Sequence, residues 1–219
     1  FKIPANFNFP FFATSPTEFW RRWHISLSTW VKDYLFYPMV FNNKKSKVRI
    51  FVSLFTTLFL IGIWHGAGWN FIIYGIMHGF YVSIDFAVRS KFPSITSNVF
   101  FRSKIGKIIS ILATQYLIFL SFLSFRIHDL ESLTYSIQKF VIFDFQTDGI
   151  GSFVLEHKLP LCLMILFVIL HFVSYNNPNL RQRIANLKLS YWIIFLTIMM
   201  IAIIFFYDAN PRDFIYFKF

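Results

Sequence analysis

Five long apolar runs divide the chain, and short polar segments that hold most of the charges separate them. The runs cover approximately residues 48–64, 69–88, 105–125, 159–175 and 189–207. None alternates with the period of two that a membrane β-strand requires, and each approaches the roughly 20 residues that a helix needs to cross a bilayer. The first and fourth runs are short enough that they could be tilted, re-entrant or partly buried in protein. We therefore expect an all-α, multi-pass transmembrane fold with five membrane-embedded helices.

The composition supports a membrane protein and argues against a soluble domain. Hydrophobic residues make up 56% of the chain and charged residues only 14%, whereas a soluble domain has about 25% charged residues. The formal net charge of +11 does not indicate nucleic-acid binding, because the cations form short clusters between apolar runs. We expect membrane lipid as a partner and no nucleic acid.

The distribution of charges between the runs predicts an orientation. Segments 42–49, 89–107 and 176–188 together carry twelve cations and no acid, whereas segments 126–158 and 208–219 carry five cations and seven acids. Five spans place these two sets on opposite sides of the membrane, and the positive-inside rule puts the first set in the cytoplasm. The C-terminus is then expected to face outward.

The first residues predict that the chain is a fragment of a longer protein. It opens with FKIPANFNFP, which has neither an initiator methionine nor a signal-peptide pattern. We expect residues 1–219 to form a single integral membrane domain that continues a longer chain before Phe1.

Two amphipathic segments are expected to lie along the membrane interface. In residues 15–37, the positions of Ser15, Pro16 and Glu18 match a capped helix start. The tryptophans that follow gather on one face at helical spacing, and His24 falls at the margin of that face. Residues 128–145 also have one apolar and one polar face, and we expect them on the outer side of the membrane.

His65 is an ionisable residue that follows a stretch without charge, residues 50–64. A polar group at such depth is costly and suggests function. Gly66 and Gly68 weaken the helix and allow a close approach of backbone or substrate, so we expect a helix break that lines a cavity. Removal from water favours the neutral imidazole, the form that a general base requires. The alternative is a core histidine that hydrogen-bonds a carbonyl group.

The histidines do not have the spacing of a metal site, and we expect no bound metal. His24, His65 and His78 have neither an i, i+4 histidine partner nor an adjacent carboxylate. For His78, which lies inside the second run, we favour packing against a neighbouring helix over chemistry.

Four motifs resemble the membrane-bound O-acyltransferase superfamily, and more narrowly its alginate O-acetyltransferase branch. They are FWRRWHISLSTWVKDYLFYP, WHGAGWNFIIYGIMHG, FLSFRIHDLESL and FIYFKF. The resemblance implies the C-terminal part of a many-helix membrane fold with a central tunnel, in the inner membrane of a bacterial cell. It places the superfamily's invariant histidine at His65 and its upstream partner at His24.

The activity implied by this resemblance is transfer of an acetyl group to hydroxyls of an extracytoplasmic polysaccharide. The implied donor is the thioester acetyl-CoA, no cofactor is bound, and an extracytoplasmic acetyltransferase is the expected partner. We expect the substrates to be contacted by the residues around the two histidines: Trp64, Gly66, Gly68, Trp69, Asn70, Arg21, Arg22 and Trp23. The arginines and tryptophans of this set could bind lipid instead.

Three alternatives remain open at this point. The teichoic acid D-alanylation branch shares the two-histidine pattern, although it typically has an asparagine before RWH, where this chain has Arg21-Arg22-Trp23. A lipid or sugar transporter would also explain a polar group at membrane depth. A subunit that only recruits an exported transferase would explain the outer amphipathic segment.

Overall fold

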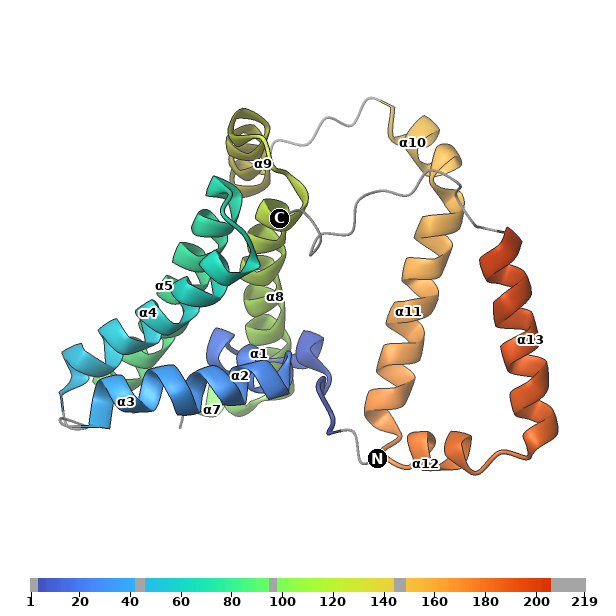
Figure 1. The fold of residues 1–219 in the computed structure, drawn as a ribbon, viewed down its shortest axis with the longest axis horizontal. Coiled ribbons are helices and arrows are strands. Elements are labelled where there is room, and N and C mark those ends of the chain that lie inside the picture. Colours follow the sequence, from blue (N-terminus) through green and yellow to red (C-terminus); the bar gives the residue numbers. More distant parts are fainter. Residues whose placement is uncertain (1–3, 42–45, 95–97, 144–148, 206–219) are drawn as a thin grey trace. The chain divides into compact units, whose positions relative to one another are not determined.

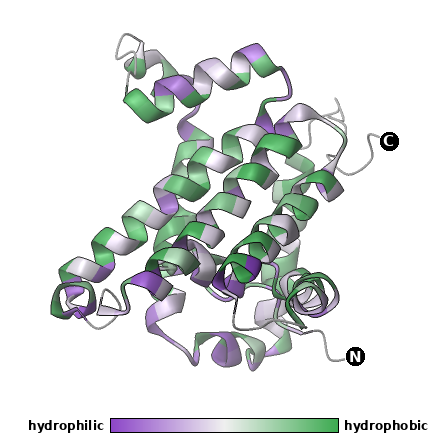
Figure 2. Cartoon of the chain, turned by 90° about the vertical axis from the view of Figure 1, so that its left-hand side faces the viewer, coloured by the Kyte–Doolittle hydropathy of each residue, from purple (hydrophilic) through white to green (hydrophobic). Residues whose placement is uncertain are grey.

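The computed structural model describes residues 4–41, 46–94, 98–143 and 149–205, which form helices and connecting turns without a strand. The all-α prediction is confirmed. The chain divides into two compact units, Phe1–Gln146 and Thr147–Phe219 (Figure 1). Hydrophobic residues predominate along the long helices (Figure 2).

Three long helices dominate the first unit. They are α4 (Lys47–His65), α5 (Trp69–Lys91) and α8 (Lys104–Arg126). Each is long and apolar enough to cross a membrane, and each matches one of the first three apolar runs. The shorter elements of this unit are η1 (Pro10–Phe12), α1 (Pro16–Arg22), α2 (Ile25–Val31), η2 (Lys32–Phe36), α3 (Tyr37–Val40), α7 (Val99–Arg102) and α9 (Leu130–Ile142).

Glycines allow α4 and α5 to pack with their backbones in contact. A Cβ added to Gly62 would lie 2.5 Å from the Cα of Gly75, and one added to Gly75 would lie 2.7 Å from the carbonyl oxygen of Phe59. Gly79, four residues after Gly75, lies against Phe55 in the same way. Small residues at this spacing are the usual means by which membrane helices approach closely. The α4–α5 hairpin therefore fixes where the C-terminal end of α4, and with it His65, lies.

The predicted interfacial helix over residues 15–37 is not continuous. Its start is confirmed, since the Ser15 hydroxyl accepts a hydrogen bond from the Glu18 N–H at 3.2 Å. The helix ends at Arg22, however, and a new helix begins at Ile25. The single-helix prediction was wrong because His24 adopts a left-handed conformation, with φ 44° and ψ 55°. Helical periodicity in a sequence does not reveal one such residue. In Figure 1, α2 and α3 run across the direction of α8.

The amphipathic segment predicted over residues 128–145 forms α9. The Asp129 side chain caps it by accepting a hydrogen bond from the Ser132 N–H at 2.8 Å. Leu133 is completely buried, whereas Leu130 and Val141 remain partly exposed. Residues 144–145 of the predicted segment lie outside the described residues.

The second unit contains α10 (Ile150–Glu156), α11 (Lys158–Asn176), α12 (Leu180–Ala185) and α13 (Leu189–Phe205). Helix α11 is long and apolar enough to cross a membrane, and α13 is a shorter apolar helix of 17 residues. Residues 206–207 of the fifth predicted run lie outside the described part of the chain. The apolar side chains of both helices are largely exposed, as expected for helices whose surroundings are lipid or other membrane helices.

Candidate active site

His65 is the last residue of α4, and aromatic rings surround its half-buried imidazole. The ring centroid lies 4.8 Å from that of Phe125 on α8 and 5.8 Å from that of Tyr74 on α5, both in edge-to-face geometry. The Phe71 ring lies 6.3 Å away. Three helices thus hold the imidazole in an apolar setting, and this supports the helix-end position predicted from the glycines.

Gly66 makes this aromatic packing possible. A Cβ at Gly66 would lie 2.6 Å from the ring of Phe71, a residue that is only 7% exposed and packs on Phe125. Because the Phe71 ring is enclosed, it has no free space into which it could move. The lack of a side chain at Gly66 therefore allows Phe71, which borders His65, to approach closely.

His24 occupies the break between α1 and α2, and an N-terminal segment satisfies the backbone groups that the break exposes. The Ile25 N–H donates to the carbonyl oxygen of Asn6 at 2.9 Å, and the Asn8 N–H donates to that of Arg22 at 2.9 Å. The Asn6 side-chain oxygen also accepts from the N–H of Ser26 at 3.0 Å and so caps α2. Left-handed backbone is costly for a residue other than glycine, and these contacts hold it in place.

His24 and His65 come from separate segments of the first unit, and they lie near enough that a charge on His24 would act on His65. His24 is half-buried, and its Nδ1 atom is buried without a hydrogen-bond partner among the described residues. The pairing of these histidines in one catalytic site stays a prediction from the resemblance.

Replacement of His24 separates the role of its backbone from that of its imidazole. We expect His24→Ala in the intact protein to slow acyl transfer by about 10²–10³-fold, the usual loss when one group that stabilises a developing oxyanion is removed. His24→Asn should keep a larger fraction of the rate, because asparagine tolerates left-handed backbone and retains a hydrogen-bond donor. Initial rates at matched membrane levels measure both effects. Equal rates for His24→Ala and wild type would contradict a role in the reaction.

His78 is a third histidine of the first unit, for which the sequence favoured packing over chemistry. It is completely buried. The Trp20 Nε1–H donates to His78 Nδ1 at 3.2 Å, and His78 Nε2 lies 2.9 Å from the Ser121 hydroxyl. Since an indole can only donate, the neutral ring carries its proton on Nε2 and donates it to Ser121. Ser121 in turn donates to the Ile118 carbonyl at 2.7 Å.

This network joins α1, α5 and α8 and satisfies both ring nitrogens of His78. The geometry agrees with the packing role favoured for His78 on sequence grounds. Trp20, the indole donor of this network, lies on α1, which ends two residues before His24. The network therefore fixes the approach of α1 to the two helices that border His65.

A double-mutant cycle tests this network. We expect Trp20→Phe and His78→Phe each to lower the free energy of unfolding by about 1–3 kcal/mol, because each leaves a buried partner without its hydrogen bond. The double variant should lose less than the sum, with a coupling of about 0.5–3 kcal/mol. Unfolding in detergent provides the measurement. Strictly additive losses would show that the hydrogen bond does not contribute.

Asn70, expected to contact substrate, is bonded within the protein. It is 2% exposed, and its amide donates to the Ser124 carbonyl at 2.9 Å. The same nitrogen lies 3.3 Å from Nδ1 of His128. Its side-chain oxygen lies against Gly68, where a Cβ would collide with it. Asn70 thus ties the start of α5 to the end of α8.

Arg22 and Trp23, also expected at the substrate, make structural contacts. The Trp23 ring packs on Phe7 and Phe19 at centroid distances of 4.9 and 5.5 Å. Arg22 forms an ion pair with Glu18 at 2.6 Å. Burial alone would raise the pKa of Glu18, but hydrogen bonds from Thr14 and the hydrogen bond and charge of Arg22 outweigh it and lower that pKa below 4.5.

The remaining predicted residues are accessible. Trp64 and Trp69, on either side of the break after α4, are 59% and 65% exposed, and Arg21 is exposed as well. Among the residues that the structure describes, no group of three or more histidine, cysteine, aspartate or glutamate side chains could hold a metal ion.

The all-helical fold with its membrane-length helices agrees with the family to which the chain is related. The model of the MBOAT, membrane-bound O-acyltransferase family, matches residues 2–125. Because the match spans more than half of the chain, the chain belongs to this family, and the protein is an integral membrane protein.

Relatives with several substrates match the chain. It is 48% identical to the probable alginate O-acetylase AlgI of Azotobacter vinelandii over 89 residues, 41% of this chain and 18% of that protein. It is 39% identical to the peptidoglycan O-acetyltransferase of Helicobacter pylori over 131 residues, 60% of this chain and 24% of that protein. It is 34% identical to the teichoic acid D-alanyltransferase of Streptococcus thermophilus over 140 residues, 57% and 33% of the two chains. The matches thus cover between a fifth and a third of the relatives' lengths.

Proposed function

We propose that the protein is an O-acyltransferase that moves an acetyl group from a cytoplasmic thioester, acetyl-CoA, toward hydroxyl groups of an extracytoplasmic polysaccharide. The observation that carries this proposal is the aromatic setting of His65 at the end of a membrane-length helix, in a chain of the acyltransferase family. The names of the alginate and peptidoglycan relatives support acetyl as the group transferred.

In the proposed reaction, His65 acts as the general base. Its neutral imidazole takes the proton of the attacking hydroxyl as the oxygen adds to the thioester carbonyl. The new C–O bond forms, the C–S bond breaks, and the thiol leaves with a proton returned by the imidazolium. His24 donates to the oxygen on which negative charge develops. A thioester is already activated, so the proposed mechanism assigns no step to a bound cofactor.

The remaining proposed contacts follow from the positions of the side chains. Trp64, Gly66, Gly68 and Trp69 surround the end of α4 and border the acyl-transfer point. Arg21 is exposed beside the His24 break and contacts lipid phosphate or the donor.

The proposed orientation places the cation-rich segments in the cytoplasm and the C-terminus outside, in a bacterial inner membrane. This arrangement explains why His65 lies at membrane depth, because the donor and the acceptor approach it from opposite sides of the membrane. An extracytoplasmic acetyltransferase that receives the acyl group is the proposed partner.

D-alanyl transfer to teichoic acid is a second candidate, favoured by the 140-residue match to the Streptococcus thermophilus protein. The experiment that separates the candidates measures ester-linked acetyl and D-alanyl groups on the cell-surface polymers. Cells would express the intact protein or its His65→Ala variant at matched levels. Acetyl lost only in the variant supports the proposal, whereas loss of D-alanyl esters supports the second candidate. Unchanged esters in both would favour a transporter or a recruiting subunit.

A further inference from the structure

A hollow of about 440 Å³ lies between the residues before α1, the C-terminal end of α5, α7 and the first half of α8. Its volume falls in the range of about 300–1,000 Å³ that is common for small-molecule sites. Its apolar walls include Pro16, Ile109 and Leu117, and Phe101 contributes an aromatic ring. Neither catalytic histidine lines it, so it is a separate feature of the first unit.

The charges of this hollow favour an anion. Arg89, Arg102 and Lys107 line it, together with one carboxylate, Asp85. Asp85 is paired with Arg89, whose Nε lies 2.6 Å from Oδ1. Among the described residues, Arg102 and Lys107 have no ion-pair partner. Two cations that face a common space without a counter-charge attract phosphate groups.

Asp85 adds a hydrogen-bonding requirement for a ligand of this hollow. Its side chain is 12% exposed, and its second oxygen, Oδ2, is buried without a hydrogen-bond partner among the described residues. A buried carboxylate oxygen that accepts no hydrogen bond is costly. The part of the Asp85 carboxylate that lines the hollow can accept a hydrogen bond from a hydroxyl or amino group of a ligand, whereas it repels a phosphate.

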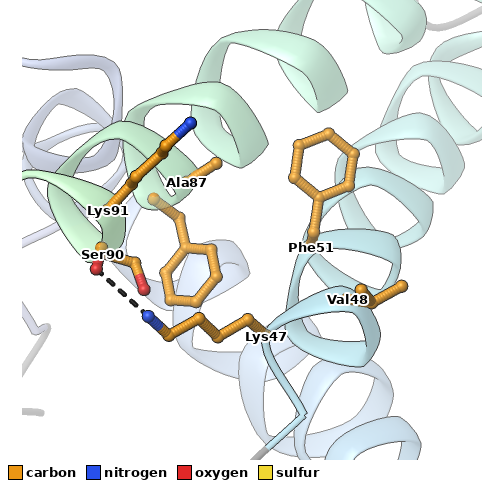
Figure 3. Close-up of a pocket in the computed structure, with 7 residues that line it drawn as sticks. Lys47, Val48, Phe51, Ala87, Ser90 and Lys91 are labelled. Carbon is orange, nitrogen blue, oxygen red and sulfur yellow. Dashed lines mark hydrogen bonds between the residues drawn. The ribbon is translucent and has the colours of Figure 1, made fainter.

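A second hollow, of about 490 Å³ between α4 and α5, shows the contrast (Figure 3). Val48, Phe51 and Ala87 give it apolar walls, and its two cations are Lys47 and Lys91. The Lys47 amine donates to the Ser90 carbonyl at 3.2 Å, as the dashed line in Figure 3 shows. The Lys91 amine lies 5.4 Å from the centre of the Phe92 ring. Both amines therefore already have partners, and no carboxylate lines this hollow.

We propose that the hollow bounded by Asp85, Arg102 and Lys107 binds a phosphorylated nucleoside. Its phosphates contact Arg102 and Lys107, a ribose hydroxyl or base amino group donates to Asp85, and the flat base lies on Phe101. This inference rests on the proposed function, because the nucleotide portion of a coenzyme A thioester has all three features. It assigns the donor's phosphates to these residues rather than to Arg21 and Arg22.

The test uses the intact protein in phosphatidylcholine nanodiscs and adenosine 3′,5′-bisphosphate as the probe, with binding followed by calorimetry. The paired variant Arg102→Ala/Lys107→Ala should bind the probe about tenfold more weakly or worse, since a hydrogen bond to a charged group contributes about 1.5–3 kcal/mol. The matched control, Lys47→Ala/Lys91→Ala, removes two cations from the other hollow and should bind normally. In turnover, the first variant should raise the KM for acetyl-CoA while kcat stays near wild type.

Competition identifies the ligand class. Bound adenosine 3′,5′-bisphosphate should be displaced far better by further adenosine 3′,5′-bisphosphate than by inorganic pyrophosphate. Adding phosphatidylglycerol to the same nanodiscs should leave binding of the probe unchanged. Equal displacement by pyrophosphate, or loss of probe binding in phosphatidylglycerol, would overturn the proposal in favour of a simple phosphate or a lipid headgroup. Equal weakening by both double variants would also overturn it. Because the probe carries no acyl group, binding without acetyl transfer would refute only the proposed function, and acetyl transfer without binding would refute only this site.

Discussion

Replacement of His65 by glutamine should lower the rate of acyl transfer by about 10²–10⁴-fold, the usual contribution of a positioned general base. Glutamine has a similar size and can still form hydrogen bonds, but it does not accept a proton at neutral pH. The rings of Tyr74 and Phe125 that border His65 would keep their packing. We therefore expect the variant to reach the membrane at normal levels with a nearly unchanged unfolding midpoint. Single-turnover rates of the purified intact protein provide the measurement.

The control for this variant is His171→Gln, since His171 also lies in an apolar helix, α11. It should transfer acyl groups at the wild-type rate. The pH dependence adds a further readout: the wild-type rate should fall toward acidic pH as the base becomes protonated, and the residual rate of His65→Gln should lack that limb. A wild-type rate in His65→Gln would remove this residue from the mechanism.

Replacement of Gly75 by valine should prevent stable folding. A Cβ at this position would lie 2.7 Å from the Phe59 carbonyl oxygen and 3.1 Å from the Cα of Gly62, both backbone atoms of α4. Backbone atoms cannot turn away as a flexible side chain does, so the two helices must separate. We expect the free energy of unfolding to fall by about 3 kcal/mol or more, at or beyond the upper end of ordinary overpacking. Thermal unfolding in detergent and the yield of monodisperse protein measure this loss.

Gly151→Ala is the matched substitution, because a Cβ at Gly151 would meet nothing within 4 Å. It lies in α10 and should be neutral or stabilise by up to about 1 kcal/mol, the helix-propensity difference between glycine and alanine. The two variants share the loss of a glycine from a helix and differ in what the new methyl group meets. Equal free energies of unfolding for Gly75→Val and Gly151→Ala would show that α4 and α5 pack less closely than in the structure.

The sequence was sufficient to predict the membrane helices, because a long run of apolar residues identifies such a helix whatever its local contacts are. Helices α4, α5 and α8 begin and end within a few residues of the first three runs. The helix cap at Ser15 was also readable, since it depends on a short spacing. His65 stood out through its depth and the glycines that follow it.

Contacts between distant segments were not readable. Periodicity placed His24 on a continuous helix, whereas the carbonyl and side chain of Asn6 stabilise a break there. Trp23 precedes His24 in sequence and Asn70 follows His65 by five residues, and this nearness made them candidates for substrate contact. Their partners, Ser124 and Phe7, are assigned only by the tertiary fold. For the same reason the hydrogen-bond partners of His78, Trp20 and Ser121, were not readable, although its packing role was favoured from the sequence.

The network around His78 also determines the order in which the membrane domain can become complete. A ribosome makes Trp20, His78 and Ser121 in that order, so the indole partner of His78 is synthesised before α5 and the Ser121 partner after it. The other nitrogen has no partner until α8 has been synthesised and inserted. A polar ring that lacks a partner in hydrocarbon costs free energy, and this cost disappears when α8 docks. Docking of α8 therefore stabilises the first unit. The same helix brings Phe125 to the side of His65.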